Sequence, residues 1–362
     1  MSKIAVLLHD CSLGGTERVA LELAHEWSKA GRKVVLLLGH DRGAFAGMVD
    51  PDIEIVTAPG PMRRGRGQVA RLGRWAAEEL ADRPDVTALF IPGNYHFPAI
   101  RAIRARNPDL HIIAKISNIL DRPDRPAWRR GGFAMITRRR LAGVDVITVL
   151  GESLRADAET VFGRDVRIVV AFDPCRAAAV PAPSHPPGTG LIAVGRLVGQ
   201  KNIVLLVDAM AQPSLAARHL LIVGDGPQRG VLELRARTLG IADRIEFVGI
   251  RHDVSAMMEA SALLLLSSLY EGYPAVAIEA LAAGIGVVTT DCTPAMDEIL
   301  PSPSLGCIVR SLNPADFALA VAAQLDGVAF DRDAAAPVVS RHRPDLAAGR
   351  YLALCDGQAA AA

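Results

Sequence analysis

The sequence is poor in the features that mark several protein classes. Aromatic residues make up 4% of the 362 residues, and the net charge is +1. Bulk charge therefore gives no reason to expect a nucleic-acid partner. No apolar run approaches the roughly 20 residues that a membrane span needs, and the N-terminal run Ile4–Leu8 lacks the length and the cleavage site of a signal peptide. These absences favour a cytoplasmic location.

Sequence patterns of disulfides and metal sites are also missing. The five cysteines are odd in number, widely scattered and without a C-x-x-C pair, so we expect reduced thiols and no zinc site. The one Asp-x-Asp string, Asp331–Asp333, lies near the C-terminus, far from every motif described below. We therefore expect no metal and no cofactor.

The length and the hydrophobic pattern predict two α/β domains. A chain of 362 residues is about twice the usual size of one domain. Short apolar runs alternate with helix-length segments, which predicts parallel sheets covered by helices on both faces. The expected strands are Ile4–Leu8, Val34–Leu38, Val86–Phe90, Ile112–Ile116, Val144–Val149, Leu191–Val194, His219–Val223, Ile245–Val248, Ala262–Leu266 and Gly286–Thr290.

One loose segment interrupts the alternation and marks the domain boundary. Residues 174–190 contain five prolines and two glycines, which do not form a regular element. We predict two doubly wound, Rossmann-like domains facing across a cleft, over residues 1–172 and 191–343, joined by a linker over 173–190. The last segment, 344–362, has helical spacing that suits packing back on the N-terminal domain.

The segment from Ser267 to Asp291 carries the strongest functional signal. A strand ends near Leu266, a loop follows with Glu271 and Gly272, and a helix is expected to begin around Pro274. The free amides of a helix N-terminus suit a diphosphate. Glu279 lies further along this otherwise apolar helix, where a carboxylate needs hydrogen-bond partners such as the two hydroxyls of a ribose.

This segment resembles the signature of a known family. The two glutamates in EGYPAVAIEALAAGIGVVTTD are similar to those of glycosyltransferase family 4, whose members are retaining enzymes of the GT-B fold. The resemblance extends over nearly the whole chain, because weaker motifs follow in the same order. These motifs are Leu13–Arg18, Gly195–Leu197 with Lys201-Asn202, Leu221–Pro227 and Phe247–Gly249.

The resemblance implies a nucleotide-sugar donor site in the C-terminal domain and an acceptor site in the N-terminal domain. Arg196 and Lys201 would hold the diphosphate and stabilise the charge of the leaving group. Glu271 would bind the donor sugar and act with these two cations in catalysis, and Glu279 would bind the ribose. The remaining donor-binding candidates are Gly14, Gly15, Gly224, Gly226, Ile250, Arg251, Gly272, Tyr273, Pro274, Ala275 and Val276.

The sequence departs from the family at one place. Many members have a histidine after the fifth strand of the first domain, whereas here Ser117 occupies that place and Asn118 follows it. His96, after the fourth strand, is the nearest alternative. These three residues are acceptor-binding or catalytic candidates, and no catalytic base is assigned. Transfer would then rest on positioning and on charge stabilisation.

Charge is divided unevenly between the two halves. Residues 1–172 contain 26 Lys and Arg against 20 Asp and Glu, while residues 173–362 contain 14 against 19. The excess lies in two stretches, Arg63–Arg74 and Arg122–Arg140. Either these arginines are an ordinary solvated surface, or they bind an anionic membrane surface on the inner, cytoplasmic side.

The resulting hypothesis is a metal-independent, retaining glycosyltransferase. It would move a hexose-type sugar from a nucleotide-diphosphate sugar to a glycan, a lipid-linked acceptor or a small molecule, in cell-surface polysaccharide or glycolipid synthesis. A nucleotide-sugar epimerase and a non-catalytic partner subunit of the same fold are the alternatives. The sequence leaves open the nucleotide base, the sugar, the acceptor and the oligomeric state.

Overall fold

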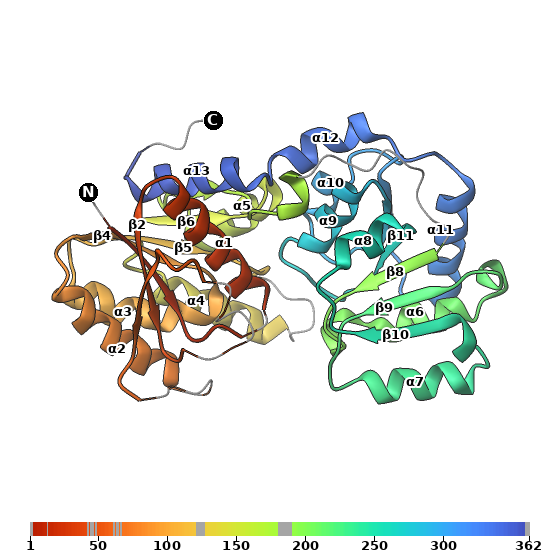
Figure 1. Ribbon diagram of the computed structural model, residues 1–362, viewed down its shortest axis with the longest axis horizontal. Helices are drawn as coiled ribbons and strands as arrows, with labels where there is room; N and C mark the ends of the chain where they lie inside the picture. Colours follow the sequence, from red (N-terminus) through yellow and green to blue (C-terminus); the bar gives the residue numbers. More distant parts are fainter. Residues whose placement is uncertain are drawn as a thin grey trace. The chain divides into compact units, whose positions relative to one another are not determined.

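The chain folds into two compact units. The computed structural model describes residues 3–12, 14–41, 43, 47, 49–60, 62, 65, 67–120, 127–179 and 190–358. The first unit combines residues 1–174 with residues 344–362, and the second spans Cys175–Arg343 (Figure 1). Residues 175–179 lie in the expected linker, but the structure assigns them to the second unit, where the short helix η3 (Arg176–Ala179) contacts α9 and α12.

The first unit contains a seven-stranded parallel sheet in the order β3-β2-β1-β4-β5-β6-β7. Helices α1 and α13 cover one face, and α2 and α3 cover the other (Figure 1). The strands are β1 (Lys3–Leu8), β2 (Lys33–Leu38), β3 (Glu54–Thr57), β4 (Val86–Ile91), β5 (His111–Lys115), β6 (Val146–Val149) and β7 (Ile168–Val170). The helices are α1 (Gly15–Lys29), α2 (Gln68–Ala81), η2 (Asn94–His96), α3 (Phe97–Arg106), α4 (Ala127–Arg140), α5 (Glu152–Phe162) and α13 (Pro344–Cys355).

The second unit contains a six-stranded parallel sheet in the order β10-β9-β8-β11-β12-β13. The strands are β8 (Gly190–Val194), β9 (Leu220–Val223), β10 (Ile245–Gly249), β11 (Ser261–Leu266), β12 (Gly286–Thr290) and β13 (Gly306–Val309). The helices are η4 (Gly199–Lys201), α6 (Ile203–Met210), η5 (Pro213–Leu215), α7 (Arg229–Thr238), η6 (Ala242–Arg244), α8 (Val254–Glu259), α9 (Ala275–Ala283), α10 (Met296–Ile299), α11 (Pro314–Asp326) and α12 (Arg332–Ser340).

The two sheets confirm the predicted fold class. All ten predicted strands form, with ends within two residues of the predicted ones. The prediction missed β3, β7 and β13, and all three are edge strands of three or four residues. Each is partly exposed to solvent, so its residues do not form the continuous apolar run that marks a buried parallel strand.

Helix α13 belongs to the core of the first unit although it is the last helix of the chain. The Trp27 indole donates to the Ala348 carbonyl oxygen at 3.0 Å, and the Tyr351 hydroxyl donates to the Ala171 carbonyl oxygen at 3.1 Å. The ring of Phe90 lies edge-on to those of Trp27 and Tyr351, with centroids 5.9 and 5.2 Å apart. Because these rings are almost fully buried, removing α13 would expose the centre of this core.

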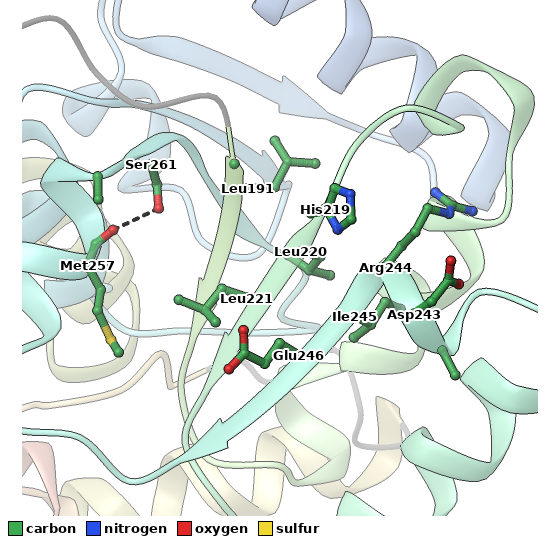
Figure 2. Close-up of a pocket in the computed structure, with 13 residues that line it drawn as sticks. Leu191, His219, Leu220, Leu221, Asp243, Arg244, Ile245, Glu246, Met257 and Ser261 are labelled. Atoms are coloured by element: carbon green, nitrogen blue, oxygen red, sulfur yellow. Dashed lines mark hydrogen bonds between the residues drawn. The ribbon is translucent and has the colours of Figure 1, made fainter.

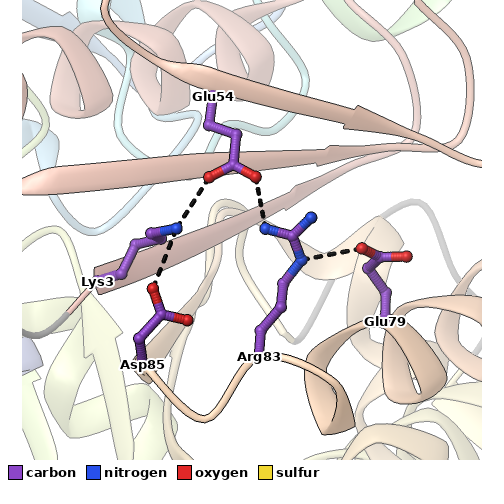
Figure 3. Close-up of polar contacts among 5 residues, drawn as sticks. All are labelled: Lys3, Glu54, Glu79, Arg83 and Asp85. Carbon is purple, nitrogen blue, oxygen red and sulfur yellow. Dashed lines mark hydrogen bonds and ion pairs between the residues drawn. The ribbon is translucent and has the colours of Figure 1, made fainter.

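An ion-pair network closes the amino edge of the first sheet (Figure 3). The Lys3 ammonium contacts Glu54 at 2.9 Å and Asp85 at 3.1 Å, and the Arg83 guanidinium bridges Glu54 and Glu79. The hydrogen bonds from Lys3 and Arg83 lower the pKa of the Glu54 carboxyl, and the bond to Glu54 is the main reason that the pKa of Lys3 is raised. The network ties β1 to β3 and to the segment between α2 and β4.

Candidate functional site

The predicted donor residues of the second unit lie at the carboxyl edge of its sheet. Lys201 follows β8, and Glu271 follows β11, which are neighbouring central strands. From β8 the chain continues outward to β9 and β10 and then returns to place β11 on the other side of β8. Open α/β sheets bind ligands at the carboxyl ends of the strands where the strand order reverses in this way.

Lys201, Glu271 and Ser268 form the polar centre of this edge. The Lys201 ammonium donates to Glu271 Oε1 at 2.6 Å, and the Ser268 hydroxyl donates to the same oxygen at 2.6 Å. The Lys201 and Glu271 side chains are 18% and 12% exposed. In the part of the chain that the structure describes, no group donates to the second oxygen, Oε2. Glu271 is therefore held by one oxygen and can accept ligand hydroxyls with the other.

Ser268 was not among the predicted site residues. It is 1% exposed and lies two residues after the end of β11, and the Thr290 hydroxyl donates to its carbonyl oxygen at 2.6 Å. The signal in the sequence is a pair of serines directly after an apolar strand. A polar side chain in such a buried place needs a partner, and here the partner is Glu271.

The N-terminus of α9 lies directly after Glu271. Pro274 is the N-cap and Ala275 the first helical residue, so the helix begins one position later than predicted. No group in the described ranges accepts a hydrogen bond from the amides of Ala275 and Val276. The preceding loop is fixed, because the Thr293 hydroxyl donates to the Gly272 carbonyl oxygen at 2.7 Å. A rigid helix start with two open amides suits an anionic group.

Two further residues of this region are the predicted ribose ligand Glu279 and the cysteine Cys292. Glu279 is half-buried in the second turn of α9. Burial, and then the nearby Glu271 carboxylate, raise the pKa of the Cys292 thiol to about 12. The thiol is therefore protonated near neutral pH, which excludes Cys292 as a thiolate nucleophile.

The glycines after β8 and β9 pack against one another. A Cβ on Gly224, whose φ is +131°, would overlap the carbonyl oxygen of Gly195, and a Cβ on Gly226 would lie 2.5 Å from that of Leu197. Both glycines therefore bring two strand-end loops together, and their expected contact with a nucleoside stays a prediction. Arg196, between these loops, is exposed and has no ion-pair partner among the described residues.

Ile250 and Arg251 lie on an exposed turn after β10. The Ile250 side chain is 57% exposed, and the Arg251 guanidinium donates two hydrogen bonds to Asp253, at 2.8 and 2.7 Å. These bonds raise the pKa of Arg251 and lower that of Asp253. The turn is thus at the correct edge of the sheet, but its cation is already paired.

Tyr273 connects the donor loop to the last loop of the second unit. Its hydroxyl lies 3.4 Å from His342 Nε2, and the two rings are tilted with centroids 5.3 Å apart. The His342 carbonyl oxygen accepts from the Cys175 amide at 2.7 Å, although the two residues lie at opposite ends of this unit's sequence. Burial raises the pKa of the Tyr273 phenol, so this ring is a neutral structural contact.

The acceptor candidates lie at the carboxyl edge of the first sheet. The Ser117 amide donates to Asn94 Oδ1 at 2.9 Å, which joins the ends of β5 and β4. Asn118 Oδ1 accepts from the Ile119 amide at 2.9 Å and so stabilises its own turn. Ser117 and Asn118 are half-buried, and the structure brings them next to η2.

His96, an acceptor-binding or catalytic candidate, is fully buried, and either role stays a prediction. Its Nε2 accepts a hydrogen bond from the His9 backbone amide at 3.1 Å. An acceptor nitrogen in this place carries no proton, which favours the neutral ring. His9, which the prediction missed, is also fully buried and lies edge-on to Tyr95, with centroids 5.7 Å apart. The contacts of His9 with His96 and Tyr95 pack the end of β1 against η2.

Gly14 and Gly15 begin α1, as predicted, but the structure gives Gly14 a local role. Gly14 is the N-cap with extended backbone, and a Cβ there would overlap the carboxylate of Glu17, which is 5% exposed. Glutamate at the third helical position commonly folds back onto the start of its own helix. Gly15 has open space around its Cα, so a contact with phosphate stays a prediction for Gly15.

A cavity of about 530 Å³ lies at the opposite, amino edge of the second sheet. Leu191, Leu221, His219 and Arg244 line it, as Figure 2 shows. The Arg244 guanidinium already donates to the carbonyl oxygens of Leu215 and Met210, both at 2.9 Å. The cavity is separated from Lys201 and Glu271 by the length of the strands, and we assign it no role in the site.

Neither a metal-binding cluster nor a membrane-spanning helix is present within the described ranges. No three His, Cys, Asp or Glu side chains gather where they could hold a metal ion. No described helix combines the length and the apolar character that crossing a bilayer requires. Part of the two basic stretches, including Arg63, Arg64, Arg66, Arg122 and Arg125, lies outside the described residues.

Curated relatives match parts of the chain. The Vi polysaccharide biosynthesis protein VipC/TviE of Salmonella typhi is 38% identical over 104 residues, which cover 28% of this chain and 18% of that protein. The 2-deoxystreptamine glucosyltransferase of Streptomyces kanamyceticus is 33% identical over 164 residues, which cover 41% of this chain and 42% of that protein. The matches thus span less than half the length of these relatives.

Solved structures match nearly the whole fold. Anabaena HepE in complex with UDP and glucose has a TM-score of 0.81, with 15% identity, over 99% of this chain and 100% of that one. A TarM variant from S. aureus, in complex with fondaparinux, alpha-GlcNAc-glycerol and UDP, has a TM-score of 0.82, with 13% identity, over 98% of this chain and 100% of that one. At such identities the likeness concerns the fold.

Two sequence families match consecutive parts of the chain. Residues 14–172 match the glycosyl transferase 4-like domain, and residues 188–326 match glycosyl transferases group 1. The first match lies in the first unit, and the second lies in the second unit and includes Lys201, Ser268 and Glu271. The chain therefore has the GT-B fold, and its two units match two glycosyltransferase domain families.

Proposed function

We propose that this chain is a retaining, metal-independent glycosyltransferase that moves a hexose-type sugar from a nucleotide-diphosphate sugar to an acceptor. The acceptor would be a glycan, a lipid-linked sugar or a small molecule of cell-surface polysaccharide or glycolipid synthesis. The proposal rests on one observation above all. Lys201, Ser268 and Glu271 meet at the carboxyl edge of the second sheet, where the strand order reverses, beside an open helix N-terminus.

Each group in this arrangement suits one part of the donor. The diphosphate would lie between the Arg196 and Lys201 side chains and the amides of Ala275 and Val276, where cations and helix dipole stabilise the leaving group. Glu271 Oε2 would accept from hydroxyls of the hexose, and Glu279 from those of the ribose. Because Glu271 is already fixed through Oε1, the sugar would meet a preorganised carboxylate.

Proton transfer in this proposal uses the donor itself. His96 is buried, with its Nε2 occupied by the His9 amide, so it is a poor candidate for a general base. The acceptor hydroxyl would attack the anomeric carbon from the side of the departing diphosphate. Its proton would pass to an oxygen of that diphosphate as the old glycosidic bond breaks, and the anomeric configuration would be kept.

The comparisons support this reading over its alternatives. HepE and TarM, whose folds resemble this one, are described as complexes with UDP. Both matching families are glycosyl transferases, which does not favour an epimerase or a non-catalytic partner. We propose a cytoplasmic site of action, at the inner face of the membrane where lipid-linked acceptors are available.

The first test is ligand-induced thermal stabilisation with UDP-, GDP-, ADP- and dTDP-sugars. A donor at 100 times its dissociation constant would stabilise the protein by about 2.7 kcal/mol. We expect one nucleotide class to raise the melting temperature of the wild-type protein, and Glu279→Ala to weaken this effect. Arg237→Ala, an exposed change on α7, is the matched control. No stabilisation by any nucleotide sugar would overturn the assignment of this site.

The second test concerns the product and the metal. With the donor found above, proton NMR of the first product should show the anomeric configuration of the donor, and transfer should continue in excess EDTA. An inverted product would contradict the retaining mechanism. Loss of activity in EDTA that a divalent cation restores would contradict metal independence.

A further inference from the structure

Three hydrogen bonds join the loop after β8 to the loop after β11 in the second unit. The Leu269 amide donates to the Gln200 carbonyl oxygen at 2.8 Å. The Ser267 hydroxyl donates to the Lys201 carbonyl oxygen at 2.8 Å. In the opposite direction, Gln200 Nε2 donates to the Tyr270 carbonyl oxygen at 2.9 Å. The two loops that carry the lysine–glutamate pair are thus tied to each other at three points.

Gln200 takes part in two of these bonds and holds the peptide groups that precede both charged residues. Its carbonyl oxygen belongs to the peptide group directly before Lys201. Its side-chain amide binds the carbonyl oxygen of the peptide group directly before Glu271. A peptide group is planar and rigid, so holding it restricts the position from which the next side chain leaves the backbone. One residue therefore restrains both side chains that meet at Glu271 Oε1.

The backbone directly after Lys201 shows that this loop is held in place by its surroundings. Asn202 lies in the left-handed region with φ +47°, and among the described residues it is the only one besides glycines with a positive φ. Such a conformation persists where neighbouring contacts enforce it, and asparagine adopts it at a lower cost than most residues. The hydrogen bond from Ser267 to the Lys201 carbonyl oxygen, in the peptide group between Lys201 and Asn202, is one such contact.

The Gln200 side chain also has a simpler explanation. Tyr270 is 8% exposed, and a carbonyl oxygen in such a place needs a hydrogen-bond donor whatever its role. A similar bond lies elsewhere in this unit, where Gln324 Nε2 of α11 donates to the Pro303 carbonyl oxygen at 3.0 Å. Helix α11 contributes none of the predicted donor residues. Gln324 is therefore a reference for a glutamine that serves only the fold.

We propose that Gln200 is a positioning residue that fixes Lys201 and Glu271 relative to each other. Without its side-chain bond, the peptide group before Glu271 would turn more freely, and the carboxylate would lose its fixed direction. The expected effect on transfer rests on the proposed function. Alignment of the pair matters more in the transition state than in the ground state. Loss of the Gln200 amide should therefore lower kcat and leave the donor KM nearly unchanged.

The first test is Gln200→Met, which keeps the length of the side chain and removes the amide donor. With the donor found by thermal shift, kcat should fall about tenfold, while the donor KM stays within about twofold of the wild type. Gln324→Met removes the corresponding bond of α11 and should keep wild-type kinetics. Wild-type kcat in Gln200→Met, or equal losses in the two glutamine variants, would overturn the role of Gln200 and leave the transferase assignment in place.

Double variants separate positioning from a general loss of loop structure. Added to Glu271→Ala, Gln200→Met should cost little more, because no carboxylate is left to position. Added to Arg196→Ala, it should cost the same factor as in the wild type. The Arg196 end of the loop is tied elsewhere, since the Leu197 amide donates to the Asp225 carbonyl oxygen at 2.9 Å. Equal further losses in the two backgrounds would overturn the proposal and make Gln200 a support of the loop alone.

A third measurement needs no transfer activity. Hydrogen–deuterium exchange of the substrate-free chain, followed on peptides that cover residues 198–203 and 267–273, should be severalfold faster in both loops of Gln200→Met. Gln324→Met should leave both loops unchanged. Wild-type exchange over residues 267–273 in Gln200→Met would overturn the proposal, whether or not a nucleotide sugar binds. Faster exchange in a chain whose wild type transfers no sugar would support the bridge and refute the proposed function.

Discussion

Each unit holds one lysine–carboxylate pair at the carboxyl edge of its sheet, and the two pairs differ in one respect. In the first unit, the Lys115 ammonium contacts both oxygens of Asp173, at 2.7 and 2.8 Å. In the second, Lys201 and Ser268 both donate to one oxygen of Glu271 and leave the other open. Both oxygens of the first carboxylate contact the lysine, whereas one oxygen of the second is left for a ligand.

The lysine side chains of the two pairs also differ in how far they are buried. The Lys115 side chain is 1% exposed and that of Lys201 is 18% exposed. The Asp173 side chain is 18% exposed, so in the first pair it is the lysine that is fully buried. Removing the carboxylate would leave the Lys115 charge in the interior. A pair that is partly open to solvent can exchange water for substrate. Two lysine–carboxylate pairs of similar distance therefore differ in whether one carboxylate oxygen stays open, and we propose that only the open pair binds a ligand.

The largest expected effect is on the stability of the first unit. Asp173→Asn keeps the size of the side chain but leaves the buried Lys115 charge without a counter-charge, and should lower the free energy of unfolding by roughly 3 kcal/mol. All three tryptophans, Trp27, Trp75 and Trp128, lie in this unit. Tryptophan fluorescence during urea unfolding therefore reports on it directly. Glu271→Gln is the control in the second unit, and its urea unfolding is followed by far-UV circular dichroism, which reports on both units. An equal loss of stability in the two variants would remove the distinction between the pairs.

The second prediction concerns the open pair. Lys201→Ala and Arg196→Ala should each lower kcat by about 10²-fold, because each removes a cation that would stabilise the leaving diphosphate. The urea unfolding midpoint followed by far-UV circular dichroism, which reports on both units, should stay near that of the wild type. Steady-state kinetics with the donor found by thermal shift would measure this effect. Wild-type turnover in both variants would show that these cations do not act on the reaction.

The third prediction tests whether the Ser268 hydroxyl positions Glu271 through its hydrogen bond to Oε1. Ser268→Ala removes one of the two donors to Glu271 Oε1 and should reduce kcat/KM by about tenfold, the usual worth of a hydrogen bond to a charged group. Ser268→Thr, which keeps the hydroxyl, should recover part of the loss. If the two variants are equally impaired, the effect comes from packing, and the hydroxyl does not position Glu271.

The smallest expected effect lies at the amino edges, where the units also differ. The first is closed by the network of Lys3, Glu54 and Arg83, whereas the second contains the cavity beside Arg244. Because the pKa of Glu54 is lowered in the folded protein, its stabilisation is present above its ordinary value of 4.5 and is lost as pH falls through the folded value.

Glu54→Gln should therefore lower stability near neutral pH by a few tenths of a kcal/mol, since the side chain is 40% exposed and screened by solvent. The difference from the wild type should shrink as the pH falls below 4.5. Urea midpoints of both proteins across this range, read by tryptophan fluorescence, would measure the change. A difference that stays constant with pH would assign the effect to side-chain packing.

The sequence by itself determined the central strands of the two sheets and the position of the motif around Glu271. Buried parallel strands such as β1 and β11 are continuous apolar runs, so their local composition predicts them. The motif around Glu271 is local too, since the strand end, the loop and the helix start follow one another directly. Edge strands such as β3 were missed because solvent takes the place of one neighbouring strand, so these residues need not all be apolar.

Only the tertiary structure decided which groups act together. Lys201 and Glu271 are 70 residues apart in the sequence, and Lys115 and Asp173 are 58 apart. No local sequence pattern shows that a lysine contacts both oxygens of Asp173 but only one oxygen of Glu271. These contacts form only when segments that are distant in sequence come together at the edge of a sheet. Their neighbours there determine how far each side chain is buried and which hydrogen-bond partners it has. The burial of His96 against the His9 amide has the same origin.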